Sequence, residues 1–458
     1  MNLIVVKTHQ KPTGFDVFVD SQRFEVTYPL VIWQSFPQNL RQQFAETVAF
    51  YFTYHLYFKD KKPLNYQFSP SLTHSLFING LLMVLPEAIL EISKAKFTAL
   101  HLFEMLYQSQ HELTYSPQTL HSDYKITPYA PNEKKVMIPL SMGKDSLLTF
   151  GITRELGLDQ TLVFFVEPHS QNEIKNKLAL GKEFMNTFQV PITYIPVSLG
   201  ALREAGGTQW GWDLILTEYT LLSLPFLHFN KIGYFLWSQE QNYHIPTTTP
   251  FGLTLTMNYD ETKKWRLMLT QLLSYFGSPA VVGSLNEPLM EFTDVYILHH
   301  RYPEIARFHL SCDNDHKNAR KSRWCHACAE CSRFYIYLLA MGVDPARVGI
   351  RENMLLSNKL RYSDVLEKET GYHYTYQFAT DTLFALYLVY KRGIKGAVVD
   401  RFKKMYLERM EKEMSLGLLN KYTSLHSSQT IPSIFKPRVL AIYKEELANM
   451  RTTISQFV

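Results

Sequence analysis

The chain has few of the features that mark membrane proteins, secreted scaffolds or nucleic-acid-binding tails. Its longest apolar stretch, near residues 75–90, is interrupted by Asn79, Gly80, Pro86 and Glu87, which argues against a membrane span. The apolar run at the N-terminus is too short for a signal peptide. The formal net charge is only +5 over 458 residues, which permits an anionic ligand without requiring nucleic acid. We therefore expect a cytoplasmic protein with no membrane partner, and nucleic acid is not its expected partner.

Two common nucleotide-binding motifs are also missing. A Walker A loop needs Gly-Lys followed by Ser or Thr, whereas Gly143-Lys144 is followed by Asp145. The G-x-G-x-x-G fingerprint of dinucleotide-binding proteins does not occur, and no internal repeat is evident. These absences leave one candidate for a phosphate-binding loop.

That candidate is Ser141-x-Gly143-x-Asp145-Ser146, which follows the apolar run 136–140 and opens an amphipathic segment. Small residues let backbone amides approach an anion, and the following helix directs its positive N-terminal end at the same point. A carboxylate in such a loop can hold the Mg²⁺ that accompanies a nucleotide. The pattern predicts an anion-binding loop, and a serine-rich turn that only caps a helix is the alternative. The predicted nucleotide-binding residues are Ser141, Met142, Gly143, Lys144, Asp145 and Ser146.

All four cysteines of the chain lie in one window of twenty residues. Cys312, Cys325, Cys328 and Cys331 have the spacing C-x12-C-x2-C-x2-C, in which two C-x2-C turns bring thiolates to one centre. Cytoplasmic redox conditions and these short spacings disfavour disulfides. We expect the four residues to bind a structural Zn²⁺, with an iron–sulfur cluster, disulfides or free thiols as the alternatives.

Changes in hydrophobic period divide the chain into three parts. We expect an N-terminal α+β domain over 1–128, an α/β domain with the cysteine cluster over 129–350, and a helical region over 351–458. At 46% hydrophobic, the chain can fill two or three cores. The aromatic run 50–54 fits a buried helix face better than a base-stacking surface. The elements expected in the first part are strands near 3–7, 15–19 and 23–28 and helices over 40–57 and 86–94.

Between residues 134 and 300, short apolar runs alternate with segments of helical period. The runs do not alternate with polar residues and are rich in Val, Ile and Phe, which suits strands buried on both faces. This order predicts a doubly wound parallel sheet with ligands at the carboxyl ends of its strands. The segment 141–146 lies at such an end. The expected strands are 136–140, 161–166, 190–197, 232–237 and 279–283.

The motif S-x-G-x-D-S resembles the PP-loop of ATP pyrophosphatases, which cleave ATP between the α and β phosphates and transfer AMP to a substrate oxygen. That pattern usually has glycine at the position of Met142. The stretch from Glu287-Pro288 through the cysteines is similar to the end of 7-cyano-7-deazaguanine synthase, including its zinc knuckle. Residues 139–148 and Ser322-Arg323-Trp324-Cys325 more closely resemble the UDP-N-acetylmuramoyl-L-alanyl-L-glutamate epimerase family, whose N-terminal region is also similar in order and size. The resemblance covers most of the chain loosely and these two motifs tightly.

The resemblance implies a PP-loop, HUP-like fold and ATP-dependent inversion of a terminal L-glutamate on a UDP-MurNAc-dipeptide-like precursor of peptidoglycan. Adenylation removes the charge of the carboxylate, so the neighbouring α proton becomes more acidic; a base removes it, a proton returns on the other face, and water releases AMP. By the same resemblance, Ser141, Gly143 and Ser146 would contact the leaving diphosphate, Lys144 would neutralise phosphate charge and Asp145 would hold Mg²⁺. The implied cofactors are ATP, Mg²⁺ and Zn²⁺, and the implied partner is a carboxylate-bearing small molecule.

The acid–base residues are harder to place from the sequence. Glu240 and Gln241 follow an expected strand and His244 lies shortly beyond, so Glu240 and His244 join Lys144 and Asp145 as catalytic candidates. Weaker candidates placed by topology alone are Asp260 and Trp210 to Asp213, whereas the two histidines expected to be structural are His299 and His300.

Two other classes of function stay open at this stage. The first is a base-modifying enzyme, either a deazaguanine synthase or a tRNA thiolase, although a thiolase usually needs a cysteine outside the metal site. The second is a non-catalytic nucleotide-binding protein in which Met142 has removed turnover. Salt-dependent tRNA binding would favour the first class, and ATP binding without AMP formation would favour the second.

Overall fold

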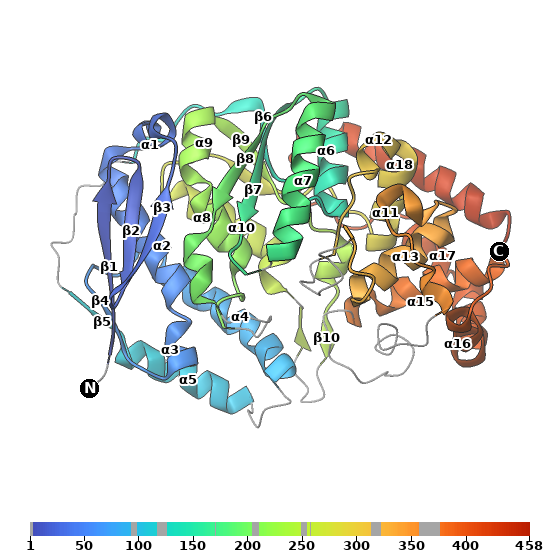
Figure 1. The fold of residues 1–458 in the computed structure, drawn as a ribbon, viewed down its shortest axis with the longest axis horizontal. Helices are drawn as coiled ribbons and strands as arrows, with labels where there is room; N and C mark the ends of the chain where they lie inside the picture. The colour runs from blue at the N-terminus through green and yellow to red at the C-terminus, as the bar shows by residue number, and fades with distance from the viewer. Residues whose placement is uncertain are drawn as a thin grey trace.

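The computed structural model describes residues 3–92, 99–116, 126–169, 171–203, 210–248, 254–256, 258–312, 322–356 and 376–458. Figure 1 shows three regions along the long axis of the molecule: an N-terminal sheet with its helices, a central sheet, and a group of C-terminal helices. Within the ranges given, we find no helix whose length and apolarity would let it cross a membrane.

The central sheet has five strands, all parallel, in the order β12-β9-β6-β7-β8. Each strand matches one expected from the sequence, so the α/β class and the parallel sheet are confirmed. The strands are β6 (Asn132–Pro139), β7 (Asp159–Val166), β8 (Ile192–Pro196), β9 (Ile232–Leu236) and β12 (Val281–Gly283).

The strands of this sheet are buried on both faces. Along β6, Val136 and Ile138 belong to one hydrophobic core, and Met137 between them belongs to another. Since successive side chains of a strand point to opposite faces, the sheet separates two cores. This arrangement explains why the strands appear in the sequence as continuous apolar runs.

The strand order reverses between β6 and β9. From β6 the chain adds β7 and then β8 on one side, and it later adds β9 and β12 on the other side. In open α/β sheets, ligands bind at the carboxyl ends of the strands where the order reverses. The loops that follow β6 and β9, residues 140–143 and 237–240, are therefore the expected place for a ligand.

Helices cover both faces of the central sheet. The core on one face contains α6 (Lys144–Glu155) and α7 (Gln171–Phe188) and extends to α11 (Glu291–Arg301), α12 (Pro303–Ala306) and α13 (Ala329–Met341). The other carries α8 (Ile215–Leu222), α9 (Leu224–Asn230) and α10 (Lys263–Ser274). A short hairpin of β10 (Thr247–Thr248) and β11 (Thr254–Leu255) lies apart from the sheet.

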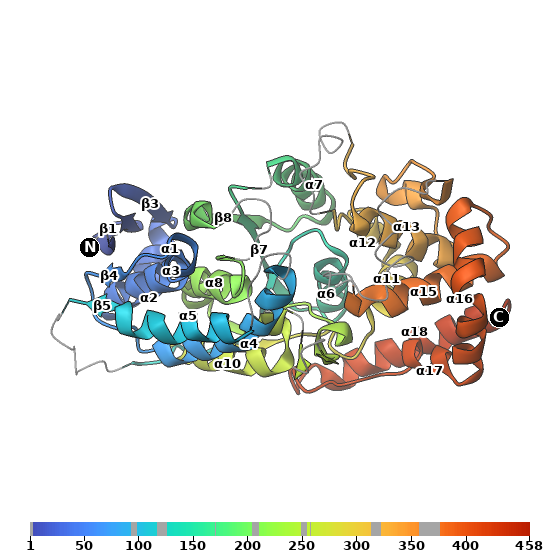
Figure 2. The same cartoon turned by 90° about the horizontal axis from the view of Figure 1, so that it is seen from below.

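The N-terminal region forms a second five-stranded sheet in the order β3-β2-β1-β4-β5. Its elements are β1 (Ile4–Lys11), β2 (Gly14–Val19), β3 (Gln22–Thr27), α1 (Leu30–Ser35), α2 (Arg41–Thr53), α3 (Leu56–Asp60), β4 (Leu64–Tyr66), α4 (His74–Ile92), α5 (Ala99–Glu112) and β5 (Thr114–Tyr115). The region shares a core with the α8–α10 face of the central sheet. Figure 2 shows α4, α5 and α10 lying along one side of the molecule.

Two expectations for the N-terminal region can be compared with the structure. The aromatic run 50–54 lies on and just after α2, and its rings are 0–2% exposed, so it packs in the core rather than forming a base-stacking surface. The expected helix 86–94 is wrong at its start, because α4 begins at His74 and Pro86 falls inside it.

The C-terminal region is helical where it is described, as expected. It contains α15 (Tyr376–Lys391), α16 (Ala397–Ser415), α17 (Leu418–Tyr422) and α18 (Lys436–Ser455). These helices share the core on the α6 face of the central sheet. The three-part division of the chain into domains stays a prediction.

Candidate functional site

The loop singled out from the sequence joins the end of β6 to the start of α6, at the point where the strand order reverses. Gly143 is the residue before the helix, and it supplies no side chain to cap the first turn. A β-carbon at Gly143 would lie 3.1 Å from Ser141 Oγ, so glycine keeps the inside of the loop open. A helix N-terminus behind an open loop is an arrangement that suits an anion.

Met142 has a left-handed backbone, with φ at 61°. This conformation disfavours residues with a β-carbon by about 1–2 kcal/mol, which explains why glycine suits the position. The Met142 side chain is fully buried in the core that covers this face of the sheet. Its carbonyl oxygen accepts a hydrogen bond from the backbone N–H of Leu310 at 2.8 Å. Burial and this bond offset the strain, so the loop keeps its shape without glycine.

Three serine hydroxyls surround the loop. Ser141 Oγ accepts from the backbone N–H of Gly143 at 3.2 Å and lies 3.3 Å from Ser146 Oγ. Ser146 Oγ donates to the carbonyl oxygen of Gly143 at 3.0 Å. Ser311 Oγ accepts from the backbone N–H of Lys144 at 3.4 Å. The sequence predicted Ser141 and Ser146, whereas Ser311 comes from a distant part of the chain and was missed.

Lys144 lies at the centre of a buried charged cluster. Its Nζ is 2.6 Å from Asp145 Oδ1, 3.3 Å from Glu240 Oε1 and 3.4 Å from Glu291 Oε1. Burial alone would lower the pKa of Lys144, but the neighbouring carboxylates outweigh it and raise that pKa well above its usual value. Lys144 is therefore a charged donor at neutral pH, and the structure brings together Lys144, Asp145 and Glu240, all predicted from the sequence.

Two carboxyl groups of this cluster have an oxygen without a hydrogen-bond partner among the described residues. The atoms are Glu240 Oε2 and Asp294 Oδ1, and both residues are 0% exposed. Burial raises the pKa of each group well above its usual value, and the nearby charge of Asp145 raises it further. Such oxygens are costly to bury unless a proton or a cation satisfies them.

Asp145, Glu240 and Asp294 can hold a cation together. Each offers one carboxylate oxygen, and the three atoms lie within 4.8 Å of one another. The residues come from three elements: α6, the loop after β9, and α11. Oxygen ligands of this kind suit Mg²⁺. Asp294 was missed because, in the sequence, it is an ordinary acidic residue near the start of a helix.

We expect divalent cation binding at these carboxyl groups to strengthen as the pH rises. Because the pKa values of Glu240 and Asp294 are raised, both groups hold protons in the metal-free fold above the usual carboxyl range, and a cation has to displace those protons. For the same reason, the stability that these two protonated groups contribute to the metal-free fold should be lost as the pH rises from about 4 toward their raised pKa values. Calorimetric titration with Mg²⁺ at pH 6, 7 and 8 should show proton release and up to about tenfold tighter binding per pH unit for each proton released. Affinity that does not change with pH would contradict this assignment.

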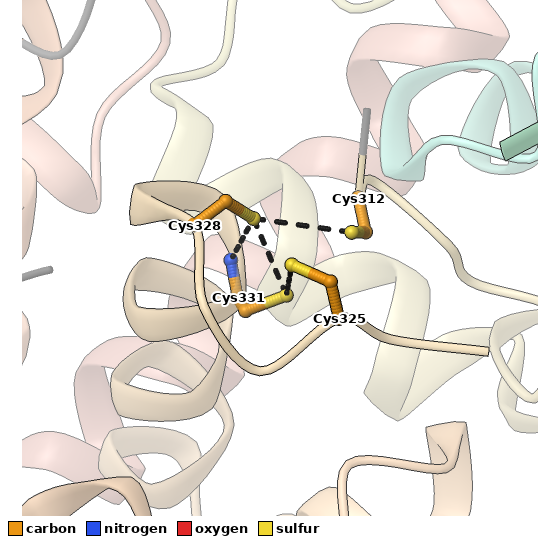
Figure 3. A group of neighbouring side chains, drawn as sticks. All are labelled: Cys312, Cys325, Cys328 and Cys331. Carbon is orange, nitrogen blue, oxygen red and sulfur yellow. Dashed lines mark hydrogen bonds between the residues drawn. The ribbon is translucent and has the colours of Figure 1, made fainter. Parts of the chain in front are cut away.

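The four cysteines converge on one point (Figure 3). The sulfur–sulfur distances are 3.9 Å between Cys312 and Cys328, 3.7 Å between Cys325 and Cys331, and 3.3 Å between Cys328 and Cys331. None of the four forms a disulfide. A tetrahedron of sulfurs around zinc has edges of about 3.8 Å when the Zn–S bond is about 2.3 Å. The cluster is therefore close enough to bind a metal such as zinc.

Local backbone geometry shapes this cluster. The turn from Cys325 to Cys328 passes through His326, whose φ of 54° is left-handed. Cys325 Sγ accepts from the backbone N–H of Ala327 at 3.3 Å, and Cys328 Sγ accepts from that of Cys331 at 3.4 Å. Cys328 thereby caps the N-terminus of α13. Such N–H donors stabilise thiolates before and after a metal binds.

His244 is placed differently from Glu240. It ends the 3-10 turn Gln241–His244, where its Nε2 is 3.1 Å from an Arg266 nitrogen and its Nδ1 lies 3.4 Å from the backbone nitrogen of Lys263. Burial, together with the charge of Arg266, lowers the pKa of His244 to about 3. His244 is thus a neutral acceptor for Arg266, bonded away from the Lys144 cluster.

The weaker candidates, Asp260 and residues 210–213, make contacts that hold the fold together. Asp260 accepts from the backbone N–H of Leu216 at 3.2 Å, and burial raises the pKa of Asp260 to about 7. In the segment 210–213, Trp210 stacks on Phe58 of α3.

The two histidines that were expected to be structural are both on α11. His299 is buried beside His309, with 3.3 Å between ring nitrogens, and burial lowers the pKa of His299 to about 3. His300 stacks on Tyr296, one turn earlier on the same helix. These contacts suit structural roles.

When the chain is compared with known proteins, no family model matches it, and neither do any curated proteins or solved structures.

Proposed function

We propose that this protein transfers AMP from ATP to a substrate carboxylate, releasing diphosphate, and that it then inverts a terminal L-glutamate on a UDP-MurNAc-dipeptide-like precursor. The observation that carries the proposal is the position of the Lys144–Asp145–Glu240–Asp294 cluster beside an open loop at the reversal of strand order. The choice of substrate rests on the motif resemblance at 139–148 and around the cysteines.

The adenylation step is a displacement at the α-phosphorus of ATP. An oxygen of the substrate carboxylate forms the new P–O bond, and the bond to the oxygen bridging the α and β phosphates breaks, so diphosphate leaves with the bonding electrons. Negative charge builds on the leaving group, where cationic and N–H donors stabilise it. Lys144 and the N-terminus of α6 are the donors that lie at this loop. Mg²⁺, when held by the carboxylates, would add charge neutralisation.

Inversion of the glutamate in the acyl adenylate requires a group that accepts the α proton and a proton returned to the opposite face of the carbon. Water then attacks the acyl carbon and releases AMP, which restores the carboxylate. Glu240 suits the role of proton acceptor because it is 0% exposed, its Oε2 has no hydrogen-bond partner among the described residues, and burial raises its pKa. His244 suits it less, because its pKa is lowered to about 3 and Arg266 uses its Nε2. Glu240 can equally serve as a cation ligand, so an experiment has to separate the two roles.

The decisive experiment is incubation of the protein with ATP, Mg²⁺ and the UDP-MurNAc dipeptide in deuterium oxide. We expect AMP and diphosphate to form in equal amounts and solvent deuterium to appear at the glutamate α carbon, measured by mass spectrometry and NMR. Adenylate formation with retained protium would instead indicate a ligase. Absence of AMP with this and other carboxylates would contradict the proposal.

The Glu240→Gln variant separates proton transfer from cation binding in the same assay. If Glu240 moves the proton, AMP and diphosphate still form while deuterium incorporation falls, on the order of a hundredfold or more. If Glu240 mainly holds the cation, both products and deuterium incorporation fall together, and Mg²⁺ affinity falls as well. Unchanged rates for all three would remove Glu240 from the site.

The base-modifying alternative is supported by a single feature, the four-cysteine cluster that follows the sheet. It predicts that tRNA or a free modified base, rather than an amino-acid carboxylate, stimulates AMP formation. Measuring AMP release with each substrate class in turn distinguishes the two proposals.

A further inference from the structure

The segment just before the first cysteine is attached to the anion-binding loop at two points. The backbone N–H of Leu310 donates to the carbonyl oxygen of Met142 at 2.8 Å. Ser311 Oγ accepts from the backbone N–H of Lys144 at 3.4 Å. Cys312, the next residue, is the first cysteine of the cluster. The cysteine cluster therefore anchors a short strap, residues 309–312, across the loop.

We propose that Ser311 is a binding residue of the anion loop, whose hydroxyl contacts the same phosphate groups as Ser141 and Ser146, and that the cysteine cluster positions it. This inference rests on the proposed function, because it takes the anion to be the diphosphate part of ATP. It adds a residue that the loop motif does not contain.

The position of Ser311 supports a direct role. A β-carbon at Gly143 would lie 3.1 Å from Ser141 Oγ and 3.7 Å from Ser311 Oγ, so both hydroxyls border the space that glycine leaves open. Ser311 is partly exposed, whereas His309 and Leu310 before it are buried. The strap thus buries its first two residues and presents the third to the loop.

The hydrogen bonds behind Ser311 allow its hydroxyl proton to point at an anion. His309 Nε2 lies 2.8 Å from Ser311 Oγ, and His309 Nδ1 lies 3.3 Å from His299 Nε2. If His299 donates to His309 and His309 donates to Ser311, the serine oxygen accepts from its protein neighbours. Its own proton is then free for the loop. A bound anion favours this direction because it needs donors.

The cysteine cluster is also connected to the Lys144 cluster through helix α13. Cys331 lies in the first turn of α13, which also carries Arg333 and Tyr337. The Arg333 guanidinium is 3.2 Å from Glu291, and the Tyr337 hydroxyl donates to Glu291 at 2.9 Å. Glu291 in turn contacts Lys144. The cysteine cluster is therefore connected to the loop by two routes, through the strap 309–312 and through α13 and Glu291. Two such connections fix the distance between Ser311 and the loop.

The test measures binding of inorganic diphosphate and of ATP, each with Mg²⁺, by calorimetry. Ser311→Ala should bind diphosphate about ten- to a hundredfold more weakly than the wild type, because a hydrogen bond to a charged group is lost. Ser311→Thr keeps the hydroxyl and should recover most of the affinity. The matched control is Ser274→Ala, which removes an exposed hydroxyl at the end of α10. Metal content and thermal midpoint are recorded for all three variants.

Each outcome bears on a different claim. Wild-type affinity in Ser311→Ala, while the wild type forms AMP from ATP, overturns the inference and leaves the proposed function intact. Equal weakening in Ser311→Ala and Ser311→Thr, with a lowered thermal midpoint in both, also overturns it, because threonine keeps the hydroxyl and the loss would then come from disturbed packing of the strap. A wild-type protein that binds neither diphosphate nor ATP overturns the proposed function and this inference together.

Discussion

Replacing Asp145 by Asn is expected to slow the formation of AMP and diphosphate at least about a hundredfold. Asparagine keeps the shape of the side chain but removes its charge. The change removes the carboxylate closest to Lys144, at 2.6 Å, and puts a neutral amide in place of one of the three carboxylates of the candidate cation site. Initial rates of AMP release from ATP, measured by chromatography at several Mg²⁺ concentrations, test the prediction. Added Mg²⁺ should restore little of the rate.

The matched control is Asp159→Asn. Asp159 is an exposed aspartate at the start of β7, at the opposite end of the sheet strands from the loop, and its contact with Lys135 is long at 3.8 Å. An exposed pair of this kind contributes little to stability, so the control should keep wild-type rates. Both variants should retain the metal of the cysteine cluster. Full nucleotide consumption by Asp145→Asn would show that the loop is not where ATP reacts.

The sequence was sufficient for the central sheet because its strands are buried on both faces. Strands such as β6 and β9 alternate between two cores rather than between core and solvent, so they appear as short apolar runs with no other plausible structure. The loop was equally visible, because a small-residue turn between a buried strand and a helix has few alternatives. Cys325, Cys328 and Cys331 are close in sequence, so local turns alone can bring their sulfurs together. Cys312 is more distant in sequence, and the fold brings it to the same point.

The rest of the site depends on contacts between distant segments. Asp294 and Ser311 meet the loop only because α11 and the strap pack against α6, and neither residue lies in a recognisable motif. His244 shows the opposite case. It lies close in sequence to Glu240, yet a 3-10 turn directs it to Arg266. Position in the sequence identified the edge of the sheet at which the site lies. It could not determine that Glu240 contacts Lys144 whereas His244 contacts Arg266.

Loss of one cysteine ligand is expected to have the largest effect on stability. Zinc binding contributes on the order of 10 kcal/mol to the folding of small zinc sites, which is as large as the net stability of most domains. The cysteine cluster joins the core that covers the α6 face of the central sheet, and Cys312, Cys325 and Cys331 are buried in it. Cys328→Ala should therefore lower the free energy of unfolding by several kcal/mol and release the metal, as measured by urea denaturation and elemental analysis.

The substitution Cys328→His is the informative control for this prediction. Histidine replaces cysteine in many zinc sites, and Cys328 is the one partly exposed member of the four, so a larger ring can be accommodated there with least strain. We expect Cys328→His to keep about one zinc per chain and most of the stability that Cys328→Ala loses. Chelator-treated wild type should regain stability when zinc is added, whereas Cys328→Ala should not. If Cys328→Ala unfolds like the wild type, the cluster does not stabilise the fold through a metal. Iron together with acid-labile sulfide in the purified protein would indicate an iron–sulfur cluster, because the same four thiolates can hold either centre.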